Sequence, residues 1–203
     1  GRGCVLGSLV VAIVASTDKD RRWFTQENVR DSKLVSPTQR EYLAEKIRER
    51  CWFQLKIATA PEIDIAVRDR SRTLNGLELE MMSACLRDSM RVFAGQETHA
   101  LIDAPSINAE GFRKKIHAAS GWNDFERLHA KHRADTLDRT VGAASIIAKS
   151  ERERLLAILK KELGHDFGSG YPHDERTIAH IKSVEHGSTH VRWSWATAQR
   201  LVE

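Results

Sequence analysis

A run of small and branched apolar residues, 5–16, most constrains how this chain of 203 residues can fold. It is rich in Val, Ile and Leu and nearly continuous in hydrophobicity, as expected for a strand covered on both faces of a sheet. Its apolar part is interrupted by Gly7 and Ser8 and falls short of the roughly 20 residues that a membrane span needs. It also lacks the charged lead and small-residue cleavage site of a signal peptide. We therefore expect a soluble, cytoplasmic protein with a buried central strand.

Strands and helices alternate along the rest of the chain. We predict helices over residues 37–50, 74–90, 108–118, 141–163, 174–186 and 194–202, and extended segments over residues 52–60, 63–67, 99–103 and 125–132. The first helix has the clearest start, because Ser36 can cap it, Pro37 suits its first position and Gln39 completes a capping box. The alternation predicts one α/β domain over residues 1–203, with a mixed sheet and a helical C-terminal portion at about 174–203.

The composition excludes several classes of protein. Hydrophobic residues make up 41% and charged residues 30%, which argues against a disordered or fibrous chain. The 32 Lys and Arg against 28 Asp and Glu give a net charge of +4, which permits a polyanionic partner without requiring one. The three cysteines form no CxxC pair, so we expect buried, reduced thiols instead of a zinc site or a disulfide.

Two aspartates stand where an α/β sheet presents ligand-binding side chains. Asp103 ends an apolar strand, and Asp135 directly precedes the long predicted helix. Side chains at the ends of strands point into the crevice where such domains bind ligands. Two carboxylates meeting there would repel each other, and divalent cations that prefer oxygen ligands would relieve the repulsion. The alternative is that Asp103 caps a turn and Asp135 caps a helix, and spacing alone leaves it open.

Three further features could contact a nucleic acid. The segment Gly168-Ser169-Gly170-Tyr171-Pro172 combines glycines that let the backbone approach a ligand with a tyrosine whose face can stack on a sugar or base. The opening Gly1-Arg2-Gly3 could present backbone N–H groups and a guanidinium to a phosphate. Lys33 and Lys149 could each meet a phosphate. A tight loop with a core tyrosine, a chance tripeptide and two solvated charges are the structural alternatives.

No residues suggest nucleophilic catalysis. The scattered histidines form neither an H-x₃-H nor an H-E-x-x-H pair, and no Ser-His-Asp signature is present. We therefore leave the following histidines out of the predicted site: His117, His129, His132, His165 and His173.

Taken together, these clusters match a known family in order and across almost the whole chain. The sequence resembles type 2 ribonuclease H, the ribonuclease HII group, and its closing segment is more similar to the archaeal and eukaryotic branch. The matching pieces are Gly1-Arg2-Gly3-Cys4-Val5-Leu6-Gly7, Asp31-Ser32-Lys33-Leu34, Ile102-Asp103, Ala134-Asp135, Ala143-Ala144-Ser145-Ile146-Ile147-Ala148-Lys149, Gly168-Ser169-Gly170-Tyr171-Pro172 and Trp193-Ser194-Trp195-Ala196-Thr197-Ala198-Gln199.

The resemblance implies a ribonuclease H-like fold with a mixed five-stranded sheet flanked by helices. It also implies hydrolysis of the RNA strand of RNA–DNA hybrids and incision of duplex DNA on the 5′ side of embedded ribonucleotides, leaving 3′-hydroxyl and 5′-phosphate ends. Asp103 and Asp135 match the third and fourth of four acidic residues that hold two Mg²⁺ or Mn²⁺ ions. By resemblance, Gly1, Arg2, Gly3 and Tyr171 detect the 2′-hydroxyl, and Arg2, Lys33 and Lys149 contact phosphates.

The sequence departs from the family pattern at its start. The family motif reads Asp-Glu-Ala-Gly-Arg-Gly, and this sequence begins at the first glycine. The first two acidic ligands and most of the opening strand are then missing, which we interpret as an N-terminal truncation. The alternative is a catalytically impaired protein that binds hybrid duplexes, and a more distant one is a nuclease of the same fold with other substrates. We expect a monomer, with contact to a sliding clamp left open.

Overall fold

The computed structural model describes residues 2–30, 32, 35–69 and 72–202. The chain divides into two compact units. A terminal unit comprises Gly1–Val10, Ile57–Leu77 and Glu151–Glu203, and a central unit comprises Val11–Lys56 and Glu78–Ser150. Each unit is described by itself below.

Four strands and nine α-helices are assigned within these described residues. In chain order they are β1 (Leu9–Ala15), α1 (Asp18–Gln26), α2 (Pro37–Arg50), β2 (Trp52–Ala58), α3 (Ala60–Arg68), α4 (Thr73–Val92), β3 (Ala100–Asp103), α5 (Ala109–Ser120), β4 (Leu128–Lys131), α6 (Ala134–Leu137), α7 (Arg139–Leu163), α8 (Glu175–Ser183) and α9 (Ala196–Val202).

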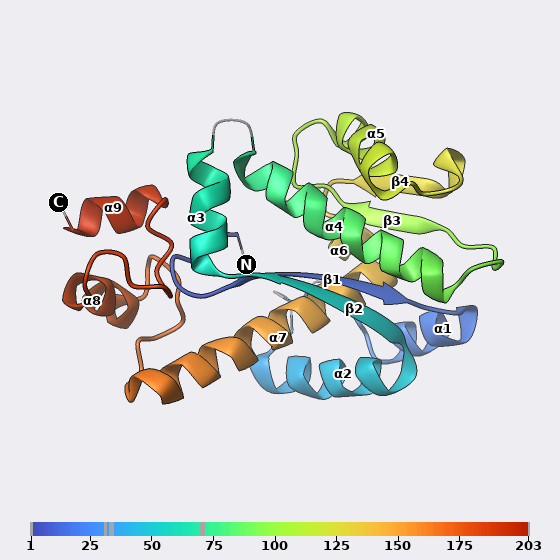
Figure 1. Ribbon diagram of the computed structural model, residues 1–203. Helices are drawn as coiled ribbons and strands as arrows, with labels where there is room; N and C mark the ends of the chain where they lie inside the picture. The colour runs from blue at the N-terminus through green and yellow to red at the C-terminus, as the bar shows by residue number, and fades with distance from the viewer. Residues whose placement is uncertain (1, 31, 33–34, 70–71, 203) are drawn as a thin grey trace. The chain divides into compact units, whose positions relative to one another are not determined.

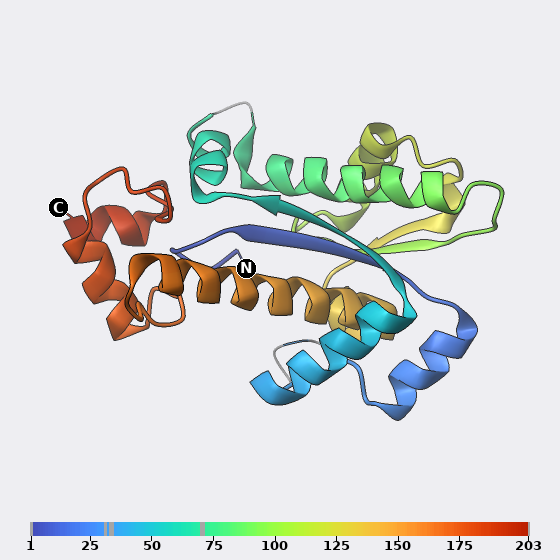
Figure 2. The ribbon, with the colours of Figure 1, turned by 60° about the horizontal axis from the view of Figure 1, so that its bottom comes forward.

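The strands form two pairs. Strand β1 pairs with β2, and β3 pairs with β4 in parallel, with Ala100 opposite Leu128 and Asp103 opposite Lys131. Helix α5 lies against β4, as both views show (Figure 1 and Figure 2). The resemblance implied one five-stranded sheet, and the described residues form two two-stranded sheets instead.

The central unit has two clusters of buried apolar side chains. In one, α2 packs against the start of α7 through Leu43, Ile47 and Ile146, all at most 1% exposed. In the other, Ile102 of β3 and Leu128 of β4 pack against Phe112 of α5. Burial of each such side chain contributes roughly 1.5–3 kcal/mol. These contacts fix the end of β3, where Asp103 lies.

The terminal unit is held by apolar packing and by two buried charged residues. Val5, Leu6, Phe167 and Ile181 belong to its core, and Leu6 bridges antiparallel to Val191. Asp64 accepts hydrogen bonds from the backbone N–H groups of Trp193 and Ser194, both at 2.9 Å. The fully buried Arg192 donates to the carbonyls of Gly7 and Ser8, both at 2.8 Å. Helices α8 and α9 contact each other in this unit.

Local signals account for the accuracy of the predicted elements. The helix over 37–50 is confirmed at both ends, and the Ser36 side chain accepts the Gln39 N–H as a cap. The extended segment predicted at 63–67 is wrong, because α3 covers it. Pro61 was interpreted as a separator, but it sits in the first turn of that helix, where its missing N–H costs nothing, and Thr59 with Glu62 forms a capping box. Helix α1 was not predicted.

Two compositional expectations can also be compared with the structure. The cysteines Cys4, Cys51 and Cys85 are buried and free of disulfides, and burial raises the pKa of Cys85 to about 12. Across the part of the chain that the structure describes, no helix combines the length and apolar character needed to cross a membrane.

Candidate active site

The two candidate metal ligands lie together in the central unit. Asp103 ends β3, and one of its carboxylate oxygens accepts the backbone N–H of Ala134 at 3.0 Å. Asp135 is the next residue, in the first turn of α6. Both aspartates are half-buried, so each is neither sealed in the core nor fully in solvent. The fold therefore brings Asp103 and Asp135 to one edge of the β3–β4 pair.

The backbone around Asp135 is tightly constrained. Arg133 precedes α6 in the left-handed conformation, with φ 55°, which is strained for a residue other than glycine. On the following helix, a Cβ placed on Gly142 would lie 3.2 Å from the Asp135 carbonyl oxygen and 3.1 Å from the Arg30 backbone. A side chain at this position would push the two backbone segments apart by a few tenths of an ångström, so the glycine favours the close approach of α7. The position of Asp135 is thus set by a strained turn and a close helix.

The structure describes only one of the two candidate lysines. Lys149 is half-buried on α7 in the central unit. Lys33 lies outside the described residues, as does Gly1. Its neighbour Ser32 is buried, with its hydroxyl accepting from Ser145 at 2.9 Å and its carbonyl accepting from Arg40 at 3.2 Å. The segment preceding Lys33 is therefore anchored to α7 and to α2.

The chemistry of Asp103 and Asp135 suits hard divalent cations, which prefer carboxylate oxygens. Within the described ranges, no group of three or more His, Cys, Asp or Glu side chains is placed to hold a metal ion. The two carboxylates therefore fit Mg²⁺ or Mn²⁺ in ligand type, and two ligands alone would fill only part of a coordination sphere.

Three of the candidate substrate contacts lie in the terminal unit. A Cβ placed on Gly3 would be 3.9 Å from Cε1 of Tyr171, so the opening segment and the tyrosine ring lie side by side. The Arg2 guanidinium donates to the Asn75 side chain at 2.8 Å and is exposed. Tyr171 is half-buried and stacks on His173, with ring centroids 5.6 Å apart. The fold thus brings Arg2, Gly3 and Tyr171 together.

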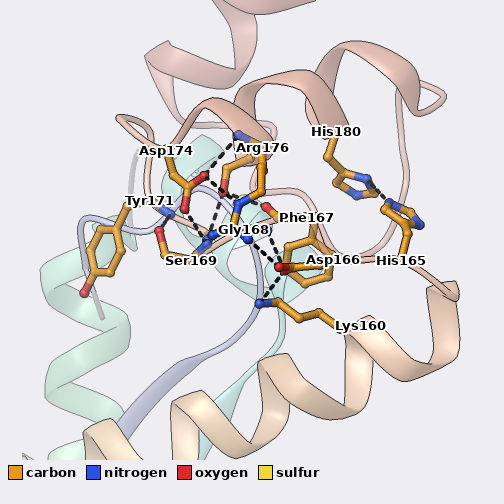
Figure 3. Close-up of polar contacts among 12 residues, drawn as sticks. Lys160, His165, Asp166, Phe167, Gly168, Ser169, Tyr171, Asp174, Arg176 and His180 are labelled. Atoms are coloured by element: carbon orange, nitrogen blue, oxygen red, sulfur yellow. Dashed lines mark hydrogen bonds and ion pairs between the residues drawn. The ribbon is translucent and has the colours of Figure 1, made fainter. Parts of the chain in front are cut away.

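The loop that carries Tyr171 is held by acidic side chains. Asp174 accepts the Ser169 N–H at 2.8 Å and caps α8 through the Arg176 N–H at 3.0 Å. Asp166 accepts the Gly168 N–H at 2.9 Å. Figure 3 shows this cluster, with the Tyr171 ring pointing away from it. The hydrogen bond from the Ser169 backbone lowers the pKa of Asp174 to about 2, against the opposite effect of burial, so the carboxylate stays charged at neutral pH.

Sequence reasoning missed Arg152, which contacts the same loop. Arg152 lies on α7 and is only 2% exposed, with its guanidinium carbon 4.8 Å from the centroid of the Tyr171 ring. One Nη donates to the Ser169 carbonyl at 2.8 Å. In the sequence, this arginine stands in a charged run, 151–154, that is typical of a solvated helix face. Nothing in that pattern indicates burial.

Three histidines of the terminal unit form a row. His165 Nε2 lies 2.9 Å from His180 Nδ1, and His180 Nε2 lies 2.8 Å from His190 Nε2. His165 Nδ1 lies 3.0 Å from the Leu163 carbonyl oxygen. Burial, together with the neighbouring His190 and His165, lowers the pKa of His180 to about 4. The histidines pair with one another and lie outside the predicted site.

Comparison with known proteins identifies the relatives of this chain. The family model described as Ribonuclease HII matches residues 1–198. A ribonuclease HII from Methanothrix thermoacetophila is 39% identical over 99% of this chain and 93% of its own.

Solved structures agree with this match. One of a PCNA:RNase HII complex from Archaeoglobus fulgidus has a TM-score of 0.84 and 35% identity, over 100% of this chain and 93% of that one. Ribonuclease H2 from Pyrococcus horikoshii has a TM-score of 0.82 and 31% identity, over 99% and 92%. The predicted ribonuclease H-like fold is therefore confirmed. A whole-chain family match, relatives above 30% identity and this fold lead to one conclusion: the chain belongs to the ribonuclease HII family, whose members are endonucleases that act on RNA–DNA hybrids.

Proposed function

We propose that this enzyme hydrolyses the RNA strand of RNA–DNA hybrids and also incises duplex DNA on the 5′ side of an embedded ribonucleotide, leaving 3′-hydroxyl and 5′-phosphate ends. The observation that carries the proposal is the hydrogen bond from the Ala134 N–H to Asp103 at the end of β3, which places Asp103 next to the backbone segment that carries Asp135.

The proposed catalytic role of the two aspartates is to bind divalent cations. Cleaving a phosphodiester builds negative charge on the phosphoryl oxygens and on the leaving oxygen, and two bound Mg²⁺ or Mn²⁺ ions would stabilise that charge and activate water. Asp103 and Asp135 would each offer carboxylate oxygens to the ions. The strained turn at Arg133 and the close approach of Gly142 hold the Asp135 backbone in place, so little reorganisation is needed.

The proposed recognition surface reads one sugar hydroxyl. A 2′-hydroxyl both donates and accepts hydrogen bonds, which distinguishes a ribonucleotide from a deoxyribonucleotide. We assign its detection to the backbone of Gly1, Arg2 and Gly3, and we assign to Tyr171 a packing contact with the sugar of the next nucleotide. The side-by-side placement of Gly3 and Tyr171 supports this assignment.

Phosphate contacts would position the duplex without reading its bases. We assign them to Arg2, Lys33 and Lys149, so that binding weakens steeply as salt concentration rises. The Archaeoglobus fulgidus relative was solved in complex with PCNA. We propose that this enzyme acts as a monomer and that it also contacts a sliding clamp.

The test uses an extended chain, in which Asp-Glu-Ala precede Gly1 and complete the family motif. With Mg²⁺ or Mn²⁺, we expect this chain to incise a DNA duplex that carries a single ribonucleotide and to degrade a long RNA–DNA hybrid. The control is the same duplex without the ribonucleotide. A folded extended chain that cuts neither substrate would overturn the proposal, and tight binding without cleavage would favour a hybrid-binding protein.

A further inference from the structure

The Arg152 side chain reaches from α7 to the loop that carries Tyr171. It holds two parts of that loop at once, because its Nη2 donates to the Ser169 carbonyl and its guanidinium carbon lies over the Tyr171 ring, 4.8 Å from the ring centroid. A cation over an aromatic face is attracted to the ring, and burial of the cation strengthens that attraction. Arg152 is only 2% exposed, whereas Tyr171 is half-buried, so the guanidinium side of this contact is shielded from water. The ring is thus fixed by a buried charge as well as by its backbone.

The intervening glycine shows how closely the guanidinium approaches the loop. Gly170 has φ 77°, and a Cβ placed on it would lie 3.1 Å from Nη2 of Arg152. The Gly170 carbonyl accepts the N–H groups of Val5 and Leu6, at 2.8 and 3.2 Å. The loop is therefore clamped between α7 and the opening segment, whose Gly3 lies beside Tyr171.

This arrangement costs stability. The buried Nε of Arg152 has no hydrogen-bond partner among the residues that the structure describes. Burial, with a contribution from the nearby positive charge of Arg152, lowers the pKa of the fully buried Arg192 to about 10. Burying a charge with incomplete compensation is expensive, and two cations near each other add repulsion. A buried polar atom without a hydrogen-bond partner destabilises the fold, so the presence of Arg152 here requires a reason other than stability.

We propose that Arg152 is a positioning residue that fixes the Tyr171 ring beside Gly3, so that discrimination in favour of a single embedded ribonucleotide depends on it. The inference rests on the proposed function, and it deepens it by naming a residue that touches no substrate. A sugar contact must be held close to its productive geometry to discriminate between substrates, and neighbouring side chains provide that support. Degradation of long hybrids offers many equivalent positions and depends less on one contact.

The experiment compares Arg152→Met with Arg154→Met in the extended chain. Arg154 is an exposed arginine on the same helix, paired with Glu151 at 2.7 Å, and serves as the matched control. For Arg152→Met we expect kcat/KM on the single-ribonucleotide duplex to fall on the order of tenfold, and on a long hybrid by less than about threefold. We expect its melting temperature to stay the same or rise. Arg154→Met should leave kcat/KM on both substrates unchanged.

A double-mutant cycle separates positioning from general structural support. If Arg152 acts through the tyrosine, Arg152→Met should cause no further loss of discrimination in a Tyr171→Ala background. Arg152→Lys retains the charge without the planar guanidinium and should recover part of the discrimination. Equal losses on both substrates, additive losses in the cycle or a fall in melting temperature that Arg152→Lys restores would each overturn the proposal.

A readout that needs no turnover keeps this proposal separate from the proposed function. Amide hydrogen exchange at Gly170 and Tyr171 should be faster in Arg152→Met than in the parent and unchanged in Arg154→Met. If the extended chain without further substitution cuts neither substrate, the proposed function fails. Exchange then decides whether Arg152 fixes the loop, and unchanged exchange in Arg152→Met overturns that role.

Discussion

The carboxylate pair in the central unit and the Tyr171 loop in the terminal unit are built in different ways. At Asp103, one hydrogen bond from a backbone N–H sets the carboxylate, and the side chain stays half-buried. At Tyr171, the loop backbone is bound by Asp166, Asp174 and Arg152 and packs against the opening segment.

The difference corresponds to the two proposed tasks. A metal ligand must keep oxygen lone pairs available, and the fold therefore fixes the backbone around Asp103 and Asp135 more than the carboxylates themselves. A contact that measures one hydroxyl group would gain selectivity from a fixed shape, and several backbone groups of the loop are bound by side chains.

The strongest test of this contrast is to remove one candidate ligand. Asp103→Asn keeps the shape and hydrogen-bonding capacity of the side chain but removes its charge, so we expect cleavage by the extended chain to fall at least about a hundredfold. Because the side chain is half-buried and not in the core, the melting temperature should change little. Glu126→Gln, an exposed carboxylate elsewhere in the central unit, is the control. Full activity in Asp103→Asn would exclude a metal-binding role.

Removing the specificity element should have a smaller and more selective effect. In the extended chain, Tyr171→Ala should reduce incision at a single ribonucleotide by about tenfold more than it reduces hydrolysis of a long hybrid, because the aromatic face against the sugar is lost. Steady-state rates on the two substrates measure this ratio. An equal loss on both would remove Tyr171 from the recognition of the junction.

The rigidity of the loop can be weakened without touching Tyr171. Asp174→Ala removes a helix cap on α8 and the acceptor of the Ser169 N–H, so we expect a loss of about 2 kcal/mol in the free energy of unfolding. Denaturant unfolding measures it. The neighbouring Glu175→Ala, an exposed residue in the same turn, should cost less than about 0.5 kcal/mol. A neutral Asp174→Ala would show that the loop is held by other contacts.

The smallest expected effect concerns pH. His180 resists protonation in the folded state until its pKa of about 4, whereas an unfolded chain takes up the proton near the ordinary value of 6.5. The unfolded state therefore binds more protons between these values, and stability falls as pH falls through that window. From pH 7 to about 5.5 we expect a loss of about 1 kcal/mol. His180→Gln should flatten this dependence, whereas the exposed His132→Gln should not.

The sequence predicted what depends on local pattern. The α2 boundaries follow from Ser36 and Pro37. Spacing alone left open whether Asp103 and Asp135 meet, because the parallel pairing of β3 with β4 joins segments far apart in the sequence. The role of Arg152 could not be predicted in this way. Its contact with Tyr171 joins two elements far apart in the chain, and a cation over a ring leaves no periodicity in the sequence. Helix α3 was missed because Pro61 was interpreted as a separator, although Thr59 and Glu62 form a capping box around it that could have been recognised in the sequence.

The carbonyl group of Leu163 sets the donor-to-acceptor direction of the hydrogen bonds in the histidine row. A carbonyl cannot donate, so His165 must carry its proton on Nδ1 toward Leu163, and its Nε2 then accepts from His180 Nδ1. His180 Nε2 in turn accepts from His190 Nε2, which leaves His190 Nδ1 as the ring nitrogen outside the row. A proton added at His190 Nδ1 would leave these bonds intact, whereas a proton added at Nε2 of His165 or His180 would turn an acceptor into a donor and break one of them. The hydrogen bonds of the row therefore fix one tautomer for each of the three rings.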